Sequence, residues 1–184
     1  KLTGFSVLNP TADDALEEVE RIVSLGLKGV MLDPEFHSVF RHQAKVEELM
    51  VPCMDNNLPV LFNTPNIEVG EGARMGREPY YNGLKNLAFK FPDVRFVVSP
   101  YWPRIKVLMI KYSNIFIDSG GRNGISGAVR LMTDIGPTRV CFGSESPQNH
   151  PGLGVKAIRT MKMPPVYRDL LLGRNAKRIF GDIF

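Results

Sequence analysis

Three carboxylates, Asp33, Asp118 and Glu145, each follow a short apolar segment of strand type. If those segments are neighbouring parallel strands, their carboxyl ends meet at one face of the fold, where a (β/α) barrel assembles its active site. Two carboxylates crowded in a cavity raise the pKa of one of them, which then acts as a general acid while the other stays ionised. We therefore predict a catalytic role for Glu145 together with Asp33 or Asp118. The residues equally allow Glu145 only to cap the loop that follows it.

Other side chains near the same predicted strand ends have the chemistry to bind a substrate. Asn63 ends the segment LPVLFNT, and Arg122 in DSGGRNG can clamp a carboxylate or a phosphate. Tyr101 and Trp102 could line a pocket for a planar substrate. Each has a plainer alternative: asparagine satisfies turn amides, a loop arginine is solvated, and aromatic side chains beside helix starts pack against neighbouring helices. These four residues are our predicted substrate-binding set.

Strands and helices alternate along the chain. The apolar runs predict six strands, at residues 3–9, 28–33, 58–64, 94–99, 114–119 and 139–144. Helical spacing of apolar residues predicts helices at 11–26, up to about 56, up to about 91, at 102–112 and at 125–136, and further helices around 157–161 and 165–180. Six consecutive βα units are the result.

Near-continuous apolar strands separated by helices indicate a parallel sheet covered by helices, the α/β class. A dinucleotide-binding open sheet has no support, since no strand is followed by a Gly-x-Gly-x-x-Gly turn, and GEGARMG (70–76) is predicted to lie in a loop. Polar residues at nearly every strand end favour a TIM-like (β/α) barrel. We expect residues 1–184 to form one such domain.

Composition excludes several classes of protein. The chain has 184 residues, 43% hydrophobic and 23% charged, as in globular domains. The net charge of +4 is spread along the chain rather than clustered, so we expect no nucleic-acid partner. No apolar stretch is long enough to span a membrane. Two cysteines without a disulfide framework or a zinc-type spacing suggest the cytoplasm.

Six stretches, in order, carry a family resemblance: LGLKGVMLDPEF, NNLPVLFNTP, FPDVRFVVSPYW, YSNIFIDSGG, IGPTRVCFGSESP and GRNAKRIFG. They resemble the amidohydrolase-related family of TIM-barrel metal-dependent hydrolases and decarboxylases, in the branch that includes aminocarboxymuconate semialdehyde decarboxylase. The resemblance implies that the six strands are the third to eighth of the barrel. The first two units, with their H-x-H strand, are absent from the given sequence, so we expect the domain to be N-terminally incomplete.

The resemblance also implies a catalytic divalent metal, held by histidines on the fifth and sixth strands and an aspartate on the eighth. Asn63, Pro100 and Glu145 take those three positions here. An amide oxygen is a weak zinc ligand and proline has no side-chain donor, so we predict no zinc held by this set. One divalent metal, zinc, remains the alternative if further N-terminal strands supply ligands. The loop histidines His37 and His150 leave a relocated metal site open.

Two functions follow. The resemblance implies a hydrolase or nonoxidative decarboxylase acting on a small carboxylated or aromatic substrate, with a degenerate metal site. The alternative is a catalytically inactive barrel that binds a small molecule or a partner. Because two strands are missing before residue 3, we expect the first strand to have an open edge, and the chain to form a homo-oligomer or to be completed by another chain segment.

Overall fold

A computed structural model describes residues 3–34, 36–37, 39–63, 71–99, 102–120 and 124–181 of the chain, with residues 71–77 described by their backbone only. Its centre is one parallel sheet. Pro100, Tyr101 and Arg122, three of the residues singled out from the sequence, lie outside the described ranges.

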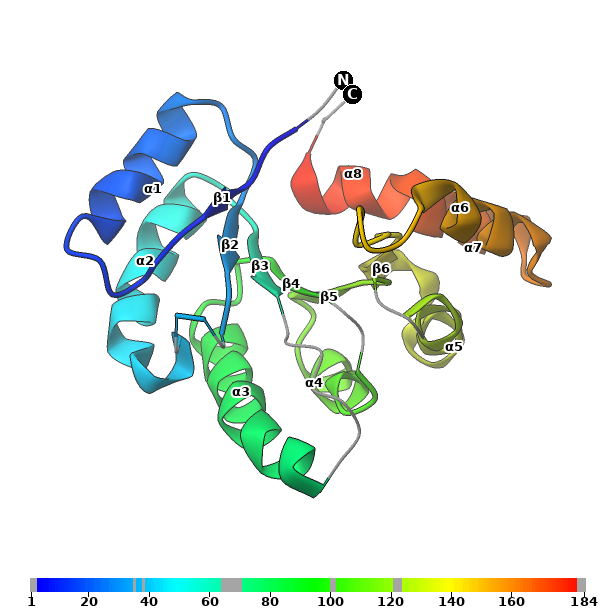
Figure 1. Cartoon of the computed structure of the whole chain (residues 1–184), viewed down its shortest axis with the longest axis horizontal. Helices are drawn as coiled ribbons and strands as arrows, with labels where there is room; N and C mark the ends of the chain where they lie inside the picture. The colour runs from blue at the N-terminus through cyan, green and yellow to red at the C-terminus, as the bar shows by residue number, and fades with distance from the viewer. Residues whose placement is uncertain are drawn as a thin grey trace.

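In this part of the chain, six strands lie side by side in sequence order: β1 (Ser6–Val7), β2 (Val30–Leu32), β3 (Val60–Asn63), β4 (Phe96–Ser99), β5 (Ile115–Asp118) and β6 (Val140–Cys141). Every neighbouring pair is parallel. The strands form an arc with helices along its outer side (Figure 1). The prediction of six βα units in a TIM-like arrangement is confirmed, although each strand is shorter than its apolar run.

Helices connect the strands: α1 (Ala15–Ser24), α2 (Gln43–Asp55), α3 (Glu71–Lys90), α4 (Ile105–Lys111) and α5 (Gly124–Ile135), followed by α6 (Pro151–Thr160), α7 (Pro165–Asp169) and α8 (Asn175–Phe180). Short helical turns η1 (Val39–Arg41) and η2 (Pro137–Arg139) precede α2 and β6, and a π-helical turn η3 (Leu170–Arg174) joins α7 to α8. The expectation that GEGARMG lies in a loop is wrong, because α3 already begins at Glu71. None of the described helices combines the length and apolarity that a bilayer crossing requires.

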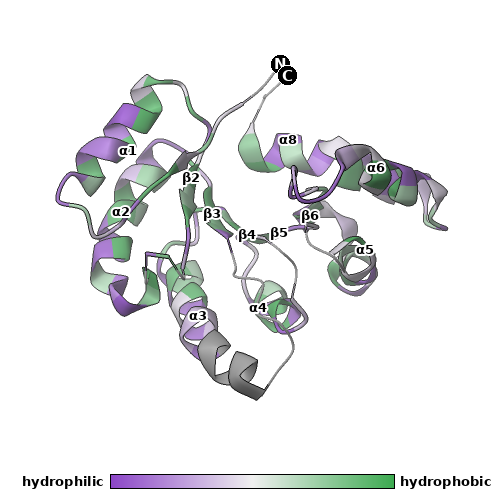
Figure 2. Cartoon of the chain, in the orientation of Figure 1, coloured by the Kyte–Doolittle hydropathy of each residue, from purple (hydrophilic) through white to green (hydrophobic). Residues whose placement is uncertain are grey.

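The main core lies between the sheet and the outer helices. Side chains alternate between the two faces of a strand, so Phe62 and Phe96 point the same way, and their rings stack with centroids 6.0 Å apart. Phe40 and Tyr80 continue this cluster toward η1 and α3. Figure 2 shows hydrophobic and hydrophilic residues alternating along the helices, and buried hydrophobic residues such as Ile22 of α1, Met50 of α2 and Met109 of α4 belong to this core.

A second, smaller cluster covers the opposite, inner face of the sheet. Val97 of β4 and Cys141 of β6 are buried against Ile179 of α8, with Leu61 and Phe116 beside them. The side chain of Asn175, at the start of α8, donates to the carbonyl oxygens of Pro137 and Val140, at 2.6 and 2.7 Å. These bonds hold α8 against β6.

Candidate active site

The polar residues that end the strands project from the inner face. Asn63 lies two residues after Leu61, and Asp118 two residues after Phe116, so each shares the face of the second cluster. The strand registers pair Asn63 with Ser99 and Asp118 with Cys141. The inner face is therefore apolar near the strand starts and polar at the carboxyl ends.

Two of the three predicted carboxylates, Asp118 and Glu145, meet beside Gly120. A Cβ atom at Gly120 would stand 3.0 Å from Glu145 Oε1 and 3.1 Å from Asp118 Oδ1, so the two oxygens lie no further apart than the sum of those distances. It would also stand 2.8 Å from Glu145 Cγ. Any residue larger than glycine here would displace the Glu145 side chain.

Asp118 is held by its backbone surroundings. Its Oδ1 accepts a hydrogen bond of 2.6 Å from the amide of Gly120. A Cβ atom at Gly143 would collide with both oxygens of the same carboxyl group. The neighbouring Ser119 is fixed in turn, since its amide donates to the carbonyl oxygen of Cys141 at 2.9 Å and its hydroxyl accepts from the amide of Gly143 at 3.3 Å. The orientation of Asp118 is thus set by close packing on two sides.

The environment of Asp118 favours its protonated form. Burial is the main cause, the Gly120 amide opposes it, and the charge of Glu145 adds to it; together they raise the pKa of Asp118 from 3.8 to about 6. The buried thiol of Cys141 lies nearby, and burial followed by the charge of Asp118 raises its pKa well above the usual value. A thiol in that state is not a nucleophile near neutral pH, which leaves Asp118 and Glu145 as the candidate acid–base groups here.

Glu145 has an unusual backbone conformation, with φ at +53°. This left-handed region is sparsely populated by residues other than glycine, asparagine and aspartate, and strain of this kind clusters at functional sites. The carbonyl oxygen of Glu145 accepts from the amide of Gln148 at 2.9 Å. The backbone of Glu145 therefore caps the following turn, while its side chain lies over Gly120.

The third carboxylate, Asp33, belongs to a different pair. The amide nitrogen of Asn63 donates to Asp33 Oδ2 at 3.0 Å, and Asp33 Oδ1 accepts from the amide of Phe36 at 2.9 Å. Of the two partners predicted for Glu145, the structure brings Asp118 to it and joins Asp33 to Asn63.

Trp102 lies in the main core, buried against the rings of Tyr80 and Tyr81 at 5.8 and 6.1 Å between centroids. Its indole nitrogen has no hydrogen-bond partner among the described residues. Sequence reasoning did not single out Gly120 and Gly143, whose missing side chains make room for the two carboxylates. Each lies two residues after the end of its strand, β5 or β6.

The residues described do not fit the metal that the sequence resemblance implies. Within them, no group of three or more His, Cys, Asp or Glu side chains is arranged to hold an ion. Asn63 is hydrogen-bonded to Asp33, and His150 uses its Nδ1 to accept from the amide of Gly152 at 3.1 Å. His37 instead packs edge-on against the ring of Phe36, at 4.9 Å between centroids.

A parallel sheet whose strands follow one another in sequence order, with polar side chains at its carboxyl ends, is the arrangement found in the TIM-barrel class of proteins. Within that class, residues 2–181 match the family model described as Amidohydrolase (Amidohydro_2). The chain belongs to this amidohydrolase family.

Solved structures with the same fold include an uncharacterized TIM-barrel protein from Bordetella bronchiseptica, which is 19% identical with a TM-score of 0.79; the match covers 97% of this chain and 66% of that one. The 5-carboxyvanillate decarboxylase LigW from Sphingomonas paucimobilis is 17% identical, with a TM-score of 0.74 and the same coverage of both chains, 97% and 66%.

A dihydroxybenzoic acid decarboxylase from Polaromonas sp. JS666, with bound manganese and the inhibitor 2-nitroresorcinol, is 15% identical with a TM-score of 0.72, over 97% of this chain and 68% of that one. A search of curated proteins gives no match. The chain thus spans about two thirds of the length of these solved structures. At these identities the likeness shows the fold alone.

Proposed function

We propose that the chain contributes the acid–base machinery of a nonoxidative decarboxylase that acts on a small aromatic carboxylate, with a degenerate metal site. The observation that carries the proposal is the Asp118–Glu145 pair, in which one carboxyl group holds its proton to about pH 6 beside a second carboxylate. The decarboxylases among the structures of the same fold support the choice of reaction.

Decarboxylation needs a proton donor near the carbon that loses its carboxylate. Protonated Asp118 gives its proton to the ring carbon, the carbon–carboxylate bond then breaks, and its electron pair returns to the ring as CO2 leaves. Asp118 recovers a proton from water, so one proton enters for each CO2 released. Ionised Glu145 keeps the pKa of Asp118 high, and an anionic substrate nearby acts in the same direction.

Most of the remaining predicted residues have roles in binding under this proposal. Asn63, oriented by Asp33, presents its carbonyl oxygen as an acceptor for a ring hydroxyl. Arg122 is the proposed partner of the substrate carboxylate. Tyr101 is proposed to flank the aromatic ring, whereas Trp102 belongs to the main core and has no part in binding under this proposal. Under this proposal Asp118 donates the proton, Asn63 accepts from a ring hydroxyl and Arg122 binds the substrate carboxylate.

A catalytically inactive barrel that binds a small molecule is the second candidate. It is favoured by the direct bond between Asn63 and Asp33, which uses polar groups that an enzyme would offer to substrate. Under that alternative, Asn63→Ala or Arg122→Ala changes ligand affinity, and there is no turnover to lose.

The test is a screen of hydroxybenzoates and other small carboxylates for CO2 release, with hydrolysis of small amides followed in parallel. The wild type, Asp118→Asn and Glu145→Gln are compared with divalent metal added and with metal chelated. We expect each variant to lose about 100-fold to 10,000-fold in rate, and the wild-type rate to fall as the pH rises through about 6. Asp13→Asn, an exposed residue before α1, is the control and should match the wild type. Equal rates in the wild type and both site variants would refute the proposal.

A further inference from the structure

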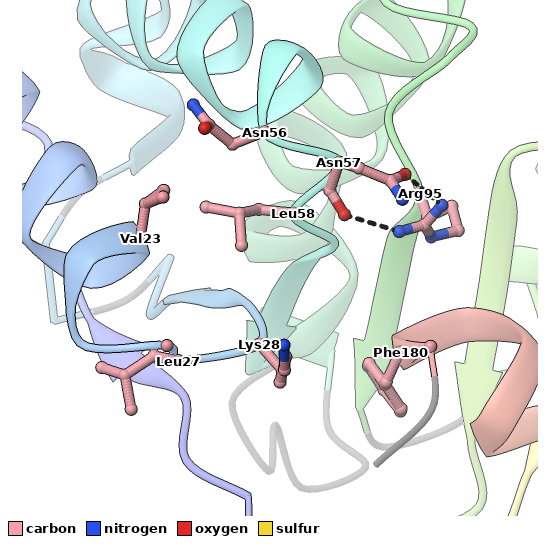
Figure 3. A pocket seen from close by; sticks show the side chains of 10 residues that line it. Val23, Leu27, Lys28, Asn56, Asn57, Leu58, Arg95 and Phe180 are labelled. Carbon is pink, nitrogen blue, oxygen red and sulfur yellow. Dashed lines mark hydrogen bonds between the residues drawn. The ribbon is translucent and has the colours of Figure 1, made fainter.

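A cavity lies at the opposite end of the sheet from Asp118. It has a volume of about 260 Å³ and is formed at the starts of β2, β3 and β4 and the end of α8. Lys28 precedes β2, Asn57 precedes β3 and Arg95 precedes β4, while Phe180 ends α8 (Figure 3). Residues at strand starts are remote from the carboxyl ends, so the proposed catalytic pair does not use this cavity.

Arg95 is a half-buried cation, and no carboxylate among the described residues lines this cavity beside it. Its two terminal nitrogens donate to the side-chain oxygen and the backbone oxygen of Asn57, both at 2.7 Å. Its Nε is enclosed and has no partner among the described residues. Burial lowers the pKa of Arg95, which shows that its surroundings disfavour the charge. Desolvating a guanidinium without a counter-ion is costly.

The lining concentrates positive charge. Its ten described residues include Lys28 and Arg95 but no Asp or Glu. Asn57 holds Arg95 in place through a backbone with φ at +55°, so the guanidinium is oriented before any ligand arrives. The carbonyl ends of α1 and α2 lie nearby and carry partial negative charge, but a helix end amounts to only about half an elementary charge. An anion would balance the two cations more fully.

Part of the wall is apolar. Leu27 and Leu58 line it, and Phe180 lines it from α8. The Phe180 ring is fixed edge-on against Phe5, with the centroids 5.1 Å apart. The volume of about 260 Å³ is just below the range of roughly 300–1,000 Å³ typical of small-molecule sites. A ligand of the size of one ring fits this space.

We propose that this cavity binds a small organic monocarboxylate, with its anionic end toward Lys28 and Arg95 and its apolar body against Leu27, Leu58 and Phe180. The site is distinct from the proposed catalytic pair and does not depend on it. Both charge and shape are required: a bare anion lacks the apolar contacts, and a neutral ring lacks the ionic ones.

The probe is benzoate, compared with its neutral counterpart benzamide and with acetate. Titration is followed by two-dimensional ¹H–¹⁵N NMR of the full chain, including the Nε–H signals of arginine. We expect benzoate to shift the amides of Gly26, Lys28 and Asn57 and the Nε–H of Arg95, saturably, and benzamide and acetate to bind at least about 10-fold more weakly.

Arg95→Gln and Lys28→Gln should each weaken benzoate binding by roughly 10-fold or more. The matched control is Arg139→Gln: Arg139 is also half-buried, donates to a backbone oxygen of Tyr112 at 2.9 Å and has a pKa lowered by burial, but it does not line the cavity. Equal binding of benzoate and benzamide, or equal losses in the Arg95 and Arg139 variants, would overturn the proposal. The absence of saturable NMR shifts on adding benzoate would overturn it as well, because Lys28 and Arg95 would then interact with the helix carbonyls only. Decarboxylase activity does not enter the measurement, so either proposal can fail without the other.

Discussion

Replacing Asp118 with asparagine should stabilise the protein at neutral pH, although it removes a residue of the proposed site. The substitution keeps the shape of the side chain and an oxygen that can accept from the Gly120 amide. It removes a charge whose surroundings disfavour it. Burial and then Glu145 hold the pKa of Asp118 at about 6, against 3.8 for an ordinary aspartate.

The sign of the pH dependence follows from proton binding. The folded protein binds this proton more tightly than the unfolded chain does. Proton binding at Asp118 therefore stabilises the wild type fully below about pH 4, and this stabilisation is lost as the pH rises through about 6. The difference between the two pKa values corresponds to about 3 kcal/mol. Asparagine does not titrate, so Asp118→Asn should equal the wild type near pH 4 and exceed it by about 2–3 kcal/mol at pH 7.

The assay is urea unfolding of both proteins at several values between pH 4 and pH 7, with the free energy of unfolding compared at each pH. Glu145→Gln tests whether the Glu145 charge helps to raise the pKa of Asp118. Without that charge the pKa falls, so this variant should lose less stability with rising pH than the wild type does, and should lose it at lower pH. Asp13→Asn should show no pH-dependent difference. A constant difference between Asp118→Asn and the wild type across this range, or a less stable variant at pH 7, would refute the assignment of a raised pKa to Asp118.

Three further outcomes test the packing. Asn175→Ala should cost about 2–3 kcal/mol in chemical unfolding, because it leaves the buried carbonyls of Pro137 and Val140 without their donor; a loss below about 0.5 kcal/mol would contradict the role given to it. Gly143→Ala should lower the free energy of unfolding, measured by thermal unfolding, by about 1–3 kcal/mol, since the new Cβ meets the Asp118 carboxyl group. Gly173→Ala is the control and should cause no such loss, because no atom lies within 4 Å of its new Cβ. The outer edge of β1 carries no strand among the described residues, so the isolated chain should associate in sedimentation, and a monodisperse monomer would count against an open edge.

The order and direction of the strands could be predicted from the sequence because each strand is a continuous apolar run followed by a helical pattern. β3 and β4 show this most clearly: Val60 and Phe62 are fully buried, as are all of the apolar residues of β4. The ends of the strands could not be predicted. An apolar residue just beyond the last hydrogen bond to a neighbouring strand cannot be told from one inside the strand by sequence alone. The start of α3 was missed because glycines at 72 and 76 weaken the helical pattern there.

The partners of the polar residues could be predicted only in part. The sequence indicates that Asp33, Asp118 and Glu145 follow strands, but the distance between any two depends on how each side chain leaves its strand. Asp118 and Glu145 are brought together by two glycines that leave room for them and by the left-handed backbone at Glu145. Neither the open space nor the backbone angle has a reliable sequence signal at a residue other than glycine.

The pKa of Asp118 stays raised although two nearby groups favour its ionised form. The helices of a βα sheet begin at the carboxyl ends of the strands, and α5 begins so close that a Cβ at Gly124 would meet the carbonyl oxygen of Ser119. A helix start favours a nearby carboxylate by about 0.3–1 kcal/mol, and the Gly120 amide acts in the same direction. The rise of the pKa from 3.8 to about 6 corresponds to about 3 kcal/mol in favour of the protonated form, relative to an ordinary aspartate. Burial and the Glu145 charge therefore outweigh both stabilising effects. A change that admits water to Asp118 should consequently lower its pKa, whereas removing the helix start should raise it, and by a smaller amount.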